Sequence, residues 1–361
     1  MKTLSLCMIV KNEEENLGNC LKNAGNYADE IIIVDTGSTD KTKDVARKYT
    51  DKVFDFEWFY DFSKARNFSF ERATSEYIIW LDADDLILEE SIKAINRWKE
   101  SEDESDVLMC PYITGFDEKF NSTFEFNRER IVKNNPLFRW KDPVHEVIVP
   151  QGKIKVFREI KVYHNKKNKP YTDRNLSIYL KLKEDGIEFS PRQQFYFARE
   201  LYFNGKIDDA IHEFSKFIAD KKGWIENNIE ACLNLSKCYS IKNELDKALT
   251  SLFGSFTFDS PRGEIVYEIG NVFMEKGQYD KAIYWYNLAM NCIPKYDSGA
   301  FINKDCYDFL PSLKLCVCYD KLGDYLTAYK FHKITENLKP NDKAVQINKK
   351  YFENLFNKKI F

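Results

Sequence analysis

Hydrophobic and polar positions follow two different patterns along the chain. In about the first 120 residues, short continuous apolar runs alternate with segments whose apolar residues recur three or four positions apart. Such runs predict strands that are buried on both faces, and the wider spacing predicts amphipathic helices. The alternation predicts a largely parallel sheet covered by helices, in which ligands bind beyond the carboxyl ends of the strands. The predicted strands are 5–10, 30–35, 51–58 and 77–82, and the predicted helices are 12–24, 38–49, 62–73 and 89–100.

From about residue 190 the pattern is helical throughout and repeats itself. Four segments share a Gly or Asn five positions before an Ala: Gly205 and Ala210, Asn243 and Ala248, Gly277 and Ala282, Gly323 and Ala328. The Gly or Asn suits a left-handed turn between two helices, and the Ala lets the second helix approach the first closely. The Ala-to-Ala spacings of 38, 34 and 46 resemble the 34-residue tetratricopeptide repeat, the last being enlarged by an insertion. This half is therefore expected to form an all-α superhelical domain of stacked helix pairs.

Composition and charge exclude several classes of protein. With 361 residues, 43% hydrophobic content, 28 Phe and 21 Tyr, the chain can bury more than one core and is not disordered. The formal net charge of −3 gives no electrostatic reason to expect nucleic acid as a partner. No apolar run approaches the ~18 residues of a transmembrane helix, and the N-terminus lacks a signal-peptide pattern, so a cytoplasmic protein is expected. The nine cysteines are scattered, and the CxC of Cys316 and Cys318 has no partner pair, which favours buried apolar thiols over a zinc site.

The first candidate for chemistry is the stretch LDADD, which follows the apolar run YIIW. Asp82 and Asp84 lie on the same side of an extended chain, and carboxylates this close shift one another's pKa unless a cation lies between them. Ligands that are all oxygen favour a hard ion such as Mg²⁺ or Mn²⁺. The structural alternative is that Asp84 or Asp85 caps the following helix.

A second candidate is VDTGSTDKT, residues 34–42. Asp35 ends a predicted strand, Gly37 permits a tight turn, and Ser38 and Thr39 are candidate caps of the next helix. A strand, turn and helix of this kind can bind a nucleotide through a carboxylate and backbone amides. Ordinary helix capping is the alternative.

These motifs, in this order, resemble the family 2 glycosyltransferases, which have the GT-A fold. The stretches that carry the resemblance are SLCMIVKNEEENLGNCL, IIIVDTGSTDKT, DFSKARN and WLDADD. The resemblance is close over about the first 115 residues and looser to about residue 165. Together with the repeats, it extends to bacterial sublancin-type S-glycosyltransferases and to flagellin- or peptide-modifying relatives.

The resemblance implies a fold and a domain organisation. Residues 1–168 are expected to form an α/β GT-A domain of the nucleotide-diphospho-sugar transferase type, with a Rossmann-like mixed sheet. Residues 169–190 are expected to form a helical linker, and 191–361 the tetratricopeptide-like superhelical domain.

The resemblance also implies roles for individual residues. Asp35 would read the nucleotide base, Asp82 would approach the ribose, and Asp84 would bind Mn²⁺ or Mg²⁺ on the donor diphosphate. His145 and His164 are candidates for additional metal ligands, although each could instead bond only a backbone carbonyl. The residues expected to bind the nucleotide sugar are Val10, Asn12, Glu13, Asp35, Gly37, Arg66, Asp82 and Ala83. For Arg66 the alternative is a surface position paired with Glu71 or Asp61.

Inverting transfer also needs a general base that deprotonates the acceptor. Many members of the family supply it from an ED pair at a helix start, for which the chain has no clear equivalent. Glu146 is the first candidate and Asp142 the second, both in RWKDPVHEVIV. A Cys acceptor, with an ordinary thiol pKa of ~8.5, would need a weaker base than Ser or Thr.

The predicted function is therefore metal-dependent, inverting transfer of a hexose or N-acetylhexosamine from a UDP-sugar to a polypeptide, at Ser/Thr or Cys. The repeats would receive the polypeptide or form a homodimer. Two alternatives stay open: transfer to a saccharide or lipid-linked glycan of the cell envelope, and a catalytically inactive repeat scaffold.

Overall fold

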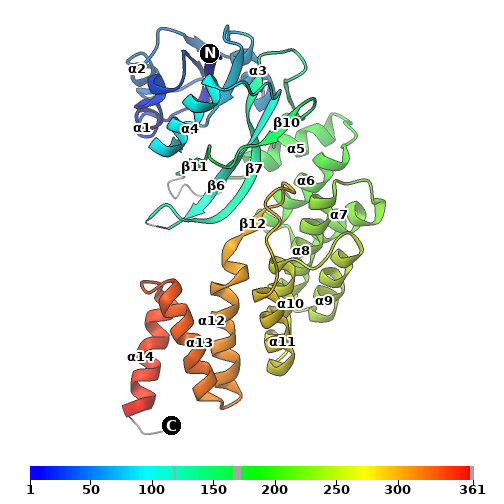
Figure 1. Ribbon diagram of the computed structural model, residues 1–361. Helices are drawn as coiled ribbons and strands as arrows, with labels where there is room; N and C mark the ends of the chain where they lie inside the picture. The colour runs from blue at the N-terminus through cyan, green and yellow to red at the C-terminus, as the bar shows by residue number, and fades with distance from the viewer. Residues whose placement is uncertain (118, 166–171, 358–361) are drawn as a thin grey trace. The chain divides into compact units, whose positions relative to one another are not determined.

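A computed structural model describes residues 1–117, 119–165 and 172–357. The chain divides into two compact units, one of residues 1–188 with 299–301 and one of residues 189–298 with those from 302 onward (Figure 1). Helix α5, Arg174–Glu184, lies within the first unit. The domain limits expected at residues 168 and 190 remain a proposal, and residues 166–171 of that junction lie outside the described residues.

The first unit contains a mixed sheet with strand order β3-β2-β1-β4-β7-β6-β11-β5. Strands β1 to β4 pair in parallel, as the alternating pattern predicts. Strand β7 runs antiparallel to both β4 and β6, so the sheet is mixed, as the GT-A resemblance implies. The strands are β1 Leu4–Val10, β2 Glu30–Asp35, β3 Val53–Asp55, β4 Tyr77–Trp80, β5 Asp85–Ile87, β6 Val107–Phe116, β7 Ser122–Lys133 and β11 Val162–His164. Strand β10, Ile154–Val156, runs along β6, and β8, Trp140–Lys141, pairs separately with β9, Val147–Ile148.

The central strands are buried on both faces, which explains why their sequences are continuously apolar. Along β1, Leu6 and Met8 join one core and Cys7 joins the other. Helices α1 (Leu17–Leu21), α2 (Thr42–Ala46) and α4 (Glu89–Glu100) contribute to the first core. Helix α3 (Phe62–Phe70) contributes Phe70 to the second core, which also contains Trp80 and Trp140.

The strand register places the segments that carry the predicted motifs at one edge of the sheet. Val10 at the end of β1 is opposite Asp35 at the end of β2, and Cys7 of β1 is opposite Trp80 at the end of β4. The loops that follow β1, β2 and β4 therefore leave the sheet at the same edge, where open α/β sheets bind ligands.

The second unit is built from consecutive helix pairs, visible as hairpins in Figure 1. The turns within the four pairs contain Gly205, Asn243, Gly277 and Gly323, with positive φ of 72°, 58°, 69° and 80°. Each of the four alanines identified in the repeats is fully buried. These observations confirm the predicted repeat and its turn chemistry. The helices are α6 Pro191–Phe203, α7 Ile207–Asp220, α8 Ile225–Ile241, α9 Leu245–Gly254, α10 Gly263–Glu275, α11 Tyr279–Met290, α12 Phe309–Lys321, α13 Tyr325–Leu338 and α14 Lys343–Asn357.

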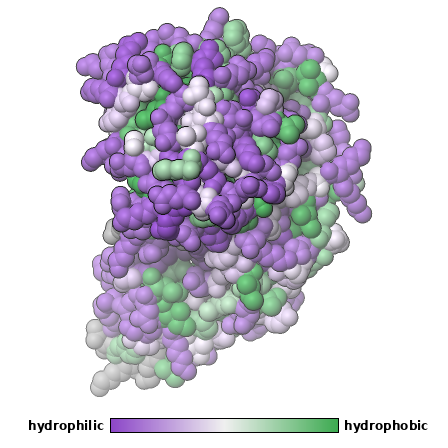
Figure 2. Space-filling view, turned by 45° about the horizontal axis from the view of Figure 1, so that its top comes forward, coloured by the Kyte–Doolittle hydropathy of each residue, from purple (hydrophilic) through white to green (hydrophobic). Residues whose placement is uncertain are grey.

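The structure also describes the surface of the chain and its thiols. Within the described ranges, no helix combines the length and the apolar character needed to cross a bilayer. On the face shown in Figure 2, hydrophilic residues dominate and hydrophobic residues occur in scattered groups. All nine cysteines are free thiols, and both Cys316 and Cys318 are buried.

Candidate active site

A cavity of about 770 Å³ lies at the sheet edge where β1, β2 and β4 end. Its volume is in the range of pockets that bind cofactors and other small ligands. The wall includes the end of β1, the segment between β3 and α3, α3 itself, and the loop after β4. Residues of β7 and β11, the loop between β8 and β9, and the start of α5 complete it. Most of the predicted site residues belong to these segments.

The turn after β2 holds Asp35 in a buried position, with 1% of its surface exposed. Its Oδ1 accepts hydrogen bonds from the backbone amides of Gly37 (2.9 Å) and Ser38 (2.8 Å). Among the described residues, Oδ2 of Asp35 is buried and has no hydrogen-bond partner. Because an unsatisfied buried carboxylate oxygen is costly, this atom suits an N–H group of a ligand.

The loops after β1 and β2 are tied to each other, which corrects the predicted capping. Asn12, in a left-handed conformation with φ of 54°, donates its backbone N–H to the Ser38 hydroxyl at 2.9 Å. The Asn12 Oδ1 atom accepts from the backbone amide of Thr39 at 2.8 Å. Ser38 and Thr39 therefore do not cap α2, whose N-cap residue is Lys41. Val10 and Glu13 line the cavity, and Asn12 lies between them in the loop after β1. Asp35 and Gly37 flank Thr36, which also lines the cavity.

The three aspartates of LDADD have three different environments. Asp82 accepts a hydrogen bond from Arg66 Nη2 on its Oδ1 atom, at 2.7 Å. Asp84 lines the cavity together with Asp82 and Ala83. Asp85 is fully buried at the start of β5. The capping alternative is wrong for both Asp84 and Asp85, because the N-cap residue of α4 is Leu88.

The buried Asp85 carboxylate organises its neighbours. Its Oδ2 accepts from the backbone amide of Asp82 at 3.0 Å and from Arg130 Nη1 at 3.2 Å. Its Oδ1 accepts from the Tyr112 hydroxyl at 3.0 Å and lies 3.1 Å from Nδ1 of His164. Asp85 is therefore a structural anchor that is already occupied by protein donors.

The pKa values of Asp82 and Asp84 shift in opposite directions. Burial raises the pKa of Asp82, but the positive charges of Arg66 and Arg130 outweigh this effect and hold it well below its usual range. Burial also raises the pKa of Asp84, and the nearby negative charges of Asp82 and Asp85 add to that effect, opposed by His164. A raised carboxyl pKa marks a position where positive charge is in short supply, which a bound cation would provide.

His164 lies in a cluster with Asp84 and Asp85 that could hold a metal ion. One ligand atom from each of Asp84, Asp85 and His164 lies within 4.8 Å of the others. The Nδ1 atom of His164 lies 3.1 Å from Oδ1 of Asp85 and 3.4 Å from Oδ1 of Asp84. In the tautomer that carries its proton on Nδ1, Asp85 would orient the ring and Nε2 would be the metal-binding atom. Burial acts to lower the pKa of His164, but Asp85, Asp84 and Asp82 outweigh it and raise that pKa. The carboxylate oxygens suit Mn²⁺ or Mg²⁺, and an imidazole nitrogen favours the transition metal Mn²⁺ of the two.

His145 lines the cavity but is not part of this three-residue cluster. It has a positive φ of 52°, and its ring stacks on Tyr179 with centroids 6.3 Å apart. Its role as a metal ligand stays a prediction.

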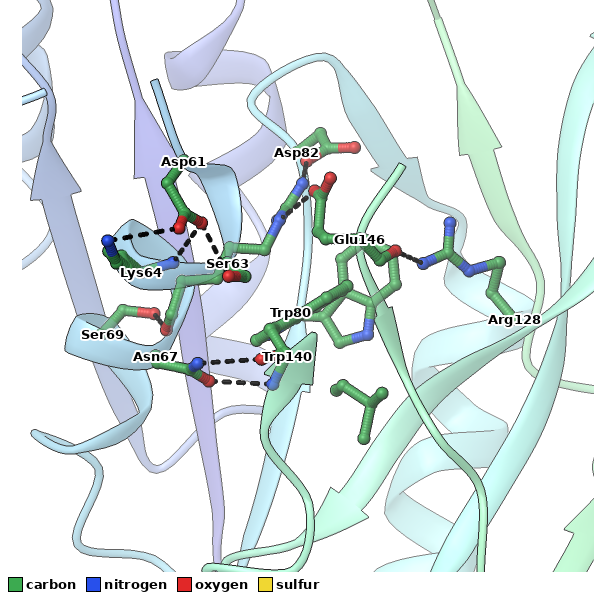
Figure 3. Close-up of polar contacts among 12 residues, drawn as sticks. Asp61, Ser63, Lys64, Asn67, Ser69, Trp80, Asp82, Arg128, Trp140 and Glu146 are labelled. Carbon is green, nitrogen blue, oxygen red and sulfur yellow. Dashed lines mark hydrogen bonds and ion pairs between the residues drawn. The ribbon is translucent and has the colours of Figure 1, made fainter. Parts of the chain in front are cut away.

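Arg66 connects two of the predicted site residues, Asp82 and Glu146, both of which are labelled in Figure 3. Its Nη2 donates to Asp82 and its Nε donates to Oε1 of Glu146, both at 2.7 Å. The guanidinium stacks on the rings of Trp80 and Trp140, 5.0 and 4.7 Å from their centroids. The surface alternative for Arg66 is wrong, because only 8% of the residue is exposed and Asp61 instead caps α3 through the amide of Lys64.

The two candidates for the general base differ in position. Glu146 lines the cavity, and Arg128 Nη2 donates to its backbone carbonyl at 3.2 Å. Asp142, in a left-handed conformation with φ of 70°, is not among the lining residues. The geometry thus brings Glu146, and not Asp142, to the cavity.

Some cavity residues were not identified from the sequence. Trp58 and Phe62 line the wall, with ring centroids 4.7 Å apart, and Arg174 lies 4.8 Å over the Phe62 ring. The sequence offered one signal: WFY at 58–60 is an aromatic cluster directly before a helix. Arg128 also lines the cavity, and its charge inside the strand sequence FNRER was a second signal.

Residues 5–172 match the sequence profile of the family described as Glycosyl transferase family 2. The N-terminal part of the chain is therefore a family 2 glycosyltransferase domain, which confirms the resemblance.

Curated relatives cover parts of the chain. A TPR repeat-containing protein of Synechococcus elongatus is 36% identical over 151 residues, which are 41% of this chain and 36% of that protein. The glycosyltransferase SunS of Bacillus subtilis is 31% identical over 237 residues, which are 61% of this chain and 54% of SunS. The chain thus spans about a third to a half of the length of these two relatives. The lipopolysaccharide core biosynthesis glycosyltransferase LpsC of Rhizobium meliloti is 26% identical, covering 55% of this chain and 78% of LpsC.

The solved structures that resemble this chain are less similar to it in sequence than these curated relatives. The crystal structure of MamA aligns with 46% of this chain and 86% of its own, with 20% identity and a TM-score of 0.37. The repeat architecture described above rests on the helix pairs and their turns, independently of this alignment.

Proposed function

We propose that this protein is a metal-dependent, inverting glycosyltransferase that moves a hexose or N-acetylhexosamine from a UDP-sugar to a polypeptide. The observation that carries the proposal is the convergence of Asp82, Asp84 and His164 on one cavity, within a family 2 glycosyltransferase domain. Two neighbouring aspartates and a histidine lie at the edge of the sheet where β1, β2 and β4 end. This arrangement fits the binding of a nucleotide diphosphate and its cation better than a purely structural role.

The donor would be held by the segments after β2 and β4. Asp35 offers its unpaired Oδ2 to an N–H of the base. The Oδ2 atom of Asp82 has no hydrogen-bond partner among the described residues and is available to a ribose hydroxyl. Asp84 and His164 would hold Mn²⁺ or Mg²⁺, which when bound stabilises the negative charge of the departing diphosphate.

The acceptor would be activated by Glu146. Its Oε1 atom accepts from Arg66, and its Oε2 atom has no hydrogen-bond partner among the described residues. In the transfer, the acceptor oxygen or sulfur forms a bond to the anomeric carbon and the bond to the diphosphate oxygen breaks. The acceptor proton goes to Glu146.

Glu146→Gln is expected to lower the transfer rate by at least ~10²-fold, because the amide cannot accept the acceptor proton as the carboxylate does. Single-turnover transfer rates measure this effect, with UDP affinity expected to change little. Glu159→Gln is a matched control, since Glu159 pairs with Arg97 on the surface with 65% of its side chain exposed. A near-normal rate for Glu146→Gln would contradict its role and move the assignment to Asp142.

A polypeptide acceptor is supported by the repeat unit, because stacked helix pairs present an extended surface of the kind that receives peptide segments. The same surface could instead serve a homodimer. A saccharide acceptor is the second candidate, and the similarity to LpsC, named for lipopolysaccharide core biosynthesis, favours it. The convergence of carboxylates in the cavity argues against an inactive scaffold.

The proposal is tested in two steps. Calorimetric titration with UDP, with and without Mn²⁺, is expected to show metal-dependent binding, and its absence would contradict the proposal. Candidate polypeptide acceptors are then incubated with a panel of UDP-sugars, and intact mass is expected to increase by one hexose or N-acetylhexosamine residue. Transfer to a glycan acceptor alone would establish the second candidate instead.

A further inference from the structure

We propose that Arg66 is a positioning residue that fixes the donor-side carboxylate of Asp82 and the acceptor-side carboxylate of Glu146 relative to each other. The inference rests on the proposed function, because it assigns Asp82 to the donor and Glu146 to the acceptor. This positioning role differs from the predicted binding of the nucleotide by Arg66. The Nε and Nη2 donors of the guanidinium already bond the carboxylates of Glu146 and Asp82.

The first observation is how the guanidinium divides its donors. Nε donates to one oxygen of Glu146 and Nη2 donates to one oxygen of Asp82, both at 2.7 Å. The second oxygen of each carboxylate has no hydrogen-bond partner among the described residues. Asp82 and Glu146 keep 31% and 13% of their side-chain surface exposed, and both line the cavity. Each carboxylate is thus anchored through one oxygen and leaves the other for a substrate.

The second observation is that the guanidinium itself cannot shift easily. It stacks on Trp80 and Trp140, and 9% of the Arg66 side chain is exposed. Asn67, the next residue of α3, makes two hydrogen bonds to the backbone of Trp140, of 2.8 and 3.0 Å. These bonds fasten α3, which carries Arg66, to the strand that carries one of the two stacking rings.

The third observation is that the Glu146 side of the arrangement is also fixed. Arg128 Nη2 holds the backbone carbonyl of Glu146, and Glu129 accepts from the backbone amide of Ile148 at 3.3 Å. The carbonyl of Pro143, three residues before Glu146, accepts from the amide of Phe62 at 2.8 Å. These contacts hold the backbone around Glu146, and the planar guanidinium of Arg66 then fixes its carboxylate relative to that of Asp82. A flexible lysine cannot reproduce this geometry.

Three substitutions and a matched control test this role. Arg66→Met fills the space of the guanidinium without its charge, and Arg66→Lys keeps the charge without the planar fork. Arg66→Ala leaves a gap beside the two indole rings, which contact each other with centroids 4.8 Å apart. Arg72→Met is the control, because Arg72 also stacks on aromatic rings, at 3.2 Å from the Phe68 centroid, but does not line the cavity. The assays are calorimetry with UDP and Mn²⁺, steady-state hydrolysis of UDP-glucose and UDP-N-acetylglucosamine, and thermal melting.

Misplacement of a catalytic group by about 1 Å costs on the order of 10²-fold in rate. Arg66→Met is therefore expected to lower kcat for donor hydrolysis by about 10²-fold while the number of UDP sites per chain stays unchanged. The kcat of Arg66→Lys is expected to exceed that of Arg66→Met by less than about tenfold, because a point charge cannot bond both carboxylates in the same plane. Arg72→Met is expected to retain the kcat of the unmodified protein.

Chemical rescue supplies a readout that a purely structural role would not give. Methylguanidine is expected to restore hydrolysis by Arg66→Ala in a saturable manner, and to leave Arg66→Met unaffected because the space of the guanidinium is filled. The proposal is overturned if Arg66→Lys is fully active, if folded Arg66→Ala shows no rescue, or if each loss of kcat matches a loss of UDP-binding sites. Absence of UDP binding and hydrolysis in the unmodified protein would instead overturn the proposed function itself.

Discussion

Asp84→Ala is expected to remove the Mn²⁺ dependence of UDP binding and to lower UDP-sugar hydrolysis by at least ~10³-fold. Asp84 lines the cavity, its carboxyl pKa is raised, and its Oδ1 atom lies 3.4 Å from Nδ1 of His164. A cation that stabilises a leaving diphosphate contributes several kcal/mol, and about 4 kcal/mol corresponds to a factor of 10³ in rate. Calorimetry with and without Mn²⁺, followed by turnover of a UDP-sugar, measures both effects.

The matched control is Asp55→Ala. Asp55 ends β3 as Asp35 ends β2, but 75% of its side chain is exposed. Its removal is expected to leave UDP binding and turnover unchanged. The circular dichroism spectra of both variants are expected to match that of the unmodified chain. Mn²⁺-dependent UDP binding by Asp84→Ala would show that the cation is held elsewhere.

Arg130→Met is expected to destabilise the first unit by about 3–5 kcal/mol, the typical cost of leaving one partner of a buried ion pair unpaired. Arg130 and Asp85 are both 0% exposed. Arg130 also donates to the carbonyl of Trp80 at 3.0 Å and stacks between Trp80 and Tyr112. Urea denaturation followed by tryptophan fluorescence measures the loss, since Trp80 and Trp140 report on this core.

Two comparisons separate the charge effect from lost packing. In Arg130→Met combined with Asp85→Asn, neither charge remains buried, so part of the lost stability is expected to return. Arg97→Met is the surface control, because the Arg97–Glu159 pair has both side chains about two-thirds exposed. It is expected to cost less than about 1 kcal/mol. If Arg130→Met also lowers the free energy of unfolding by less than about 1 kcal/mol, the buried-pair argument is refuted.

Elements set by local pattern could be predicted from the sequence. The four parallel strands are continuous apolar runs because both faces are covered, and the repeat turns need a left-handed residue, which Gly and Asn supply. The elements between residues 120 and 190 could not be predicted in the same way from the sequence pattern. Its strands β8 and β9 have two residues each, which is too short for any periodicity.

The environments of individual site residues could be predicted only in part. LDADD indicated a cation site, but nothing in the stretch distinguishes Asp85 from its neighbours. Its burial depends on the pairing of β5 with β11, 79 residues away at His164. Likewise, Arg66 pairs with Glu146, 80 residues distant, and not with the acidic residues of its own neighbourhood. Such contacts depend on tertiary packing, which a single sequence does not encode in its spacing.

The position of α5 has a consequence for building chimeras from this chain. Thr172, Arg174 and Asn175 line the cavity, although the family profile ends at residue 172 and the sequence suggested a linker from 169. A chimera that exchanges the repeats for another binding module keeps this wall only if the junction falls after Glu184, the last residue of α5. Cutting the chain where the family similarity ends would leave the pocket open on that side.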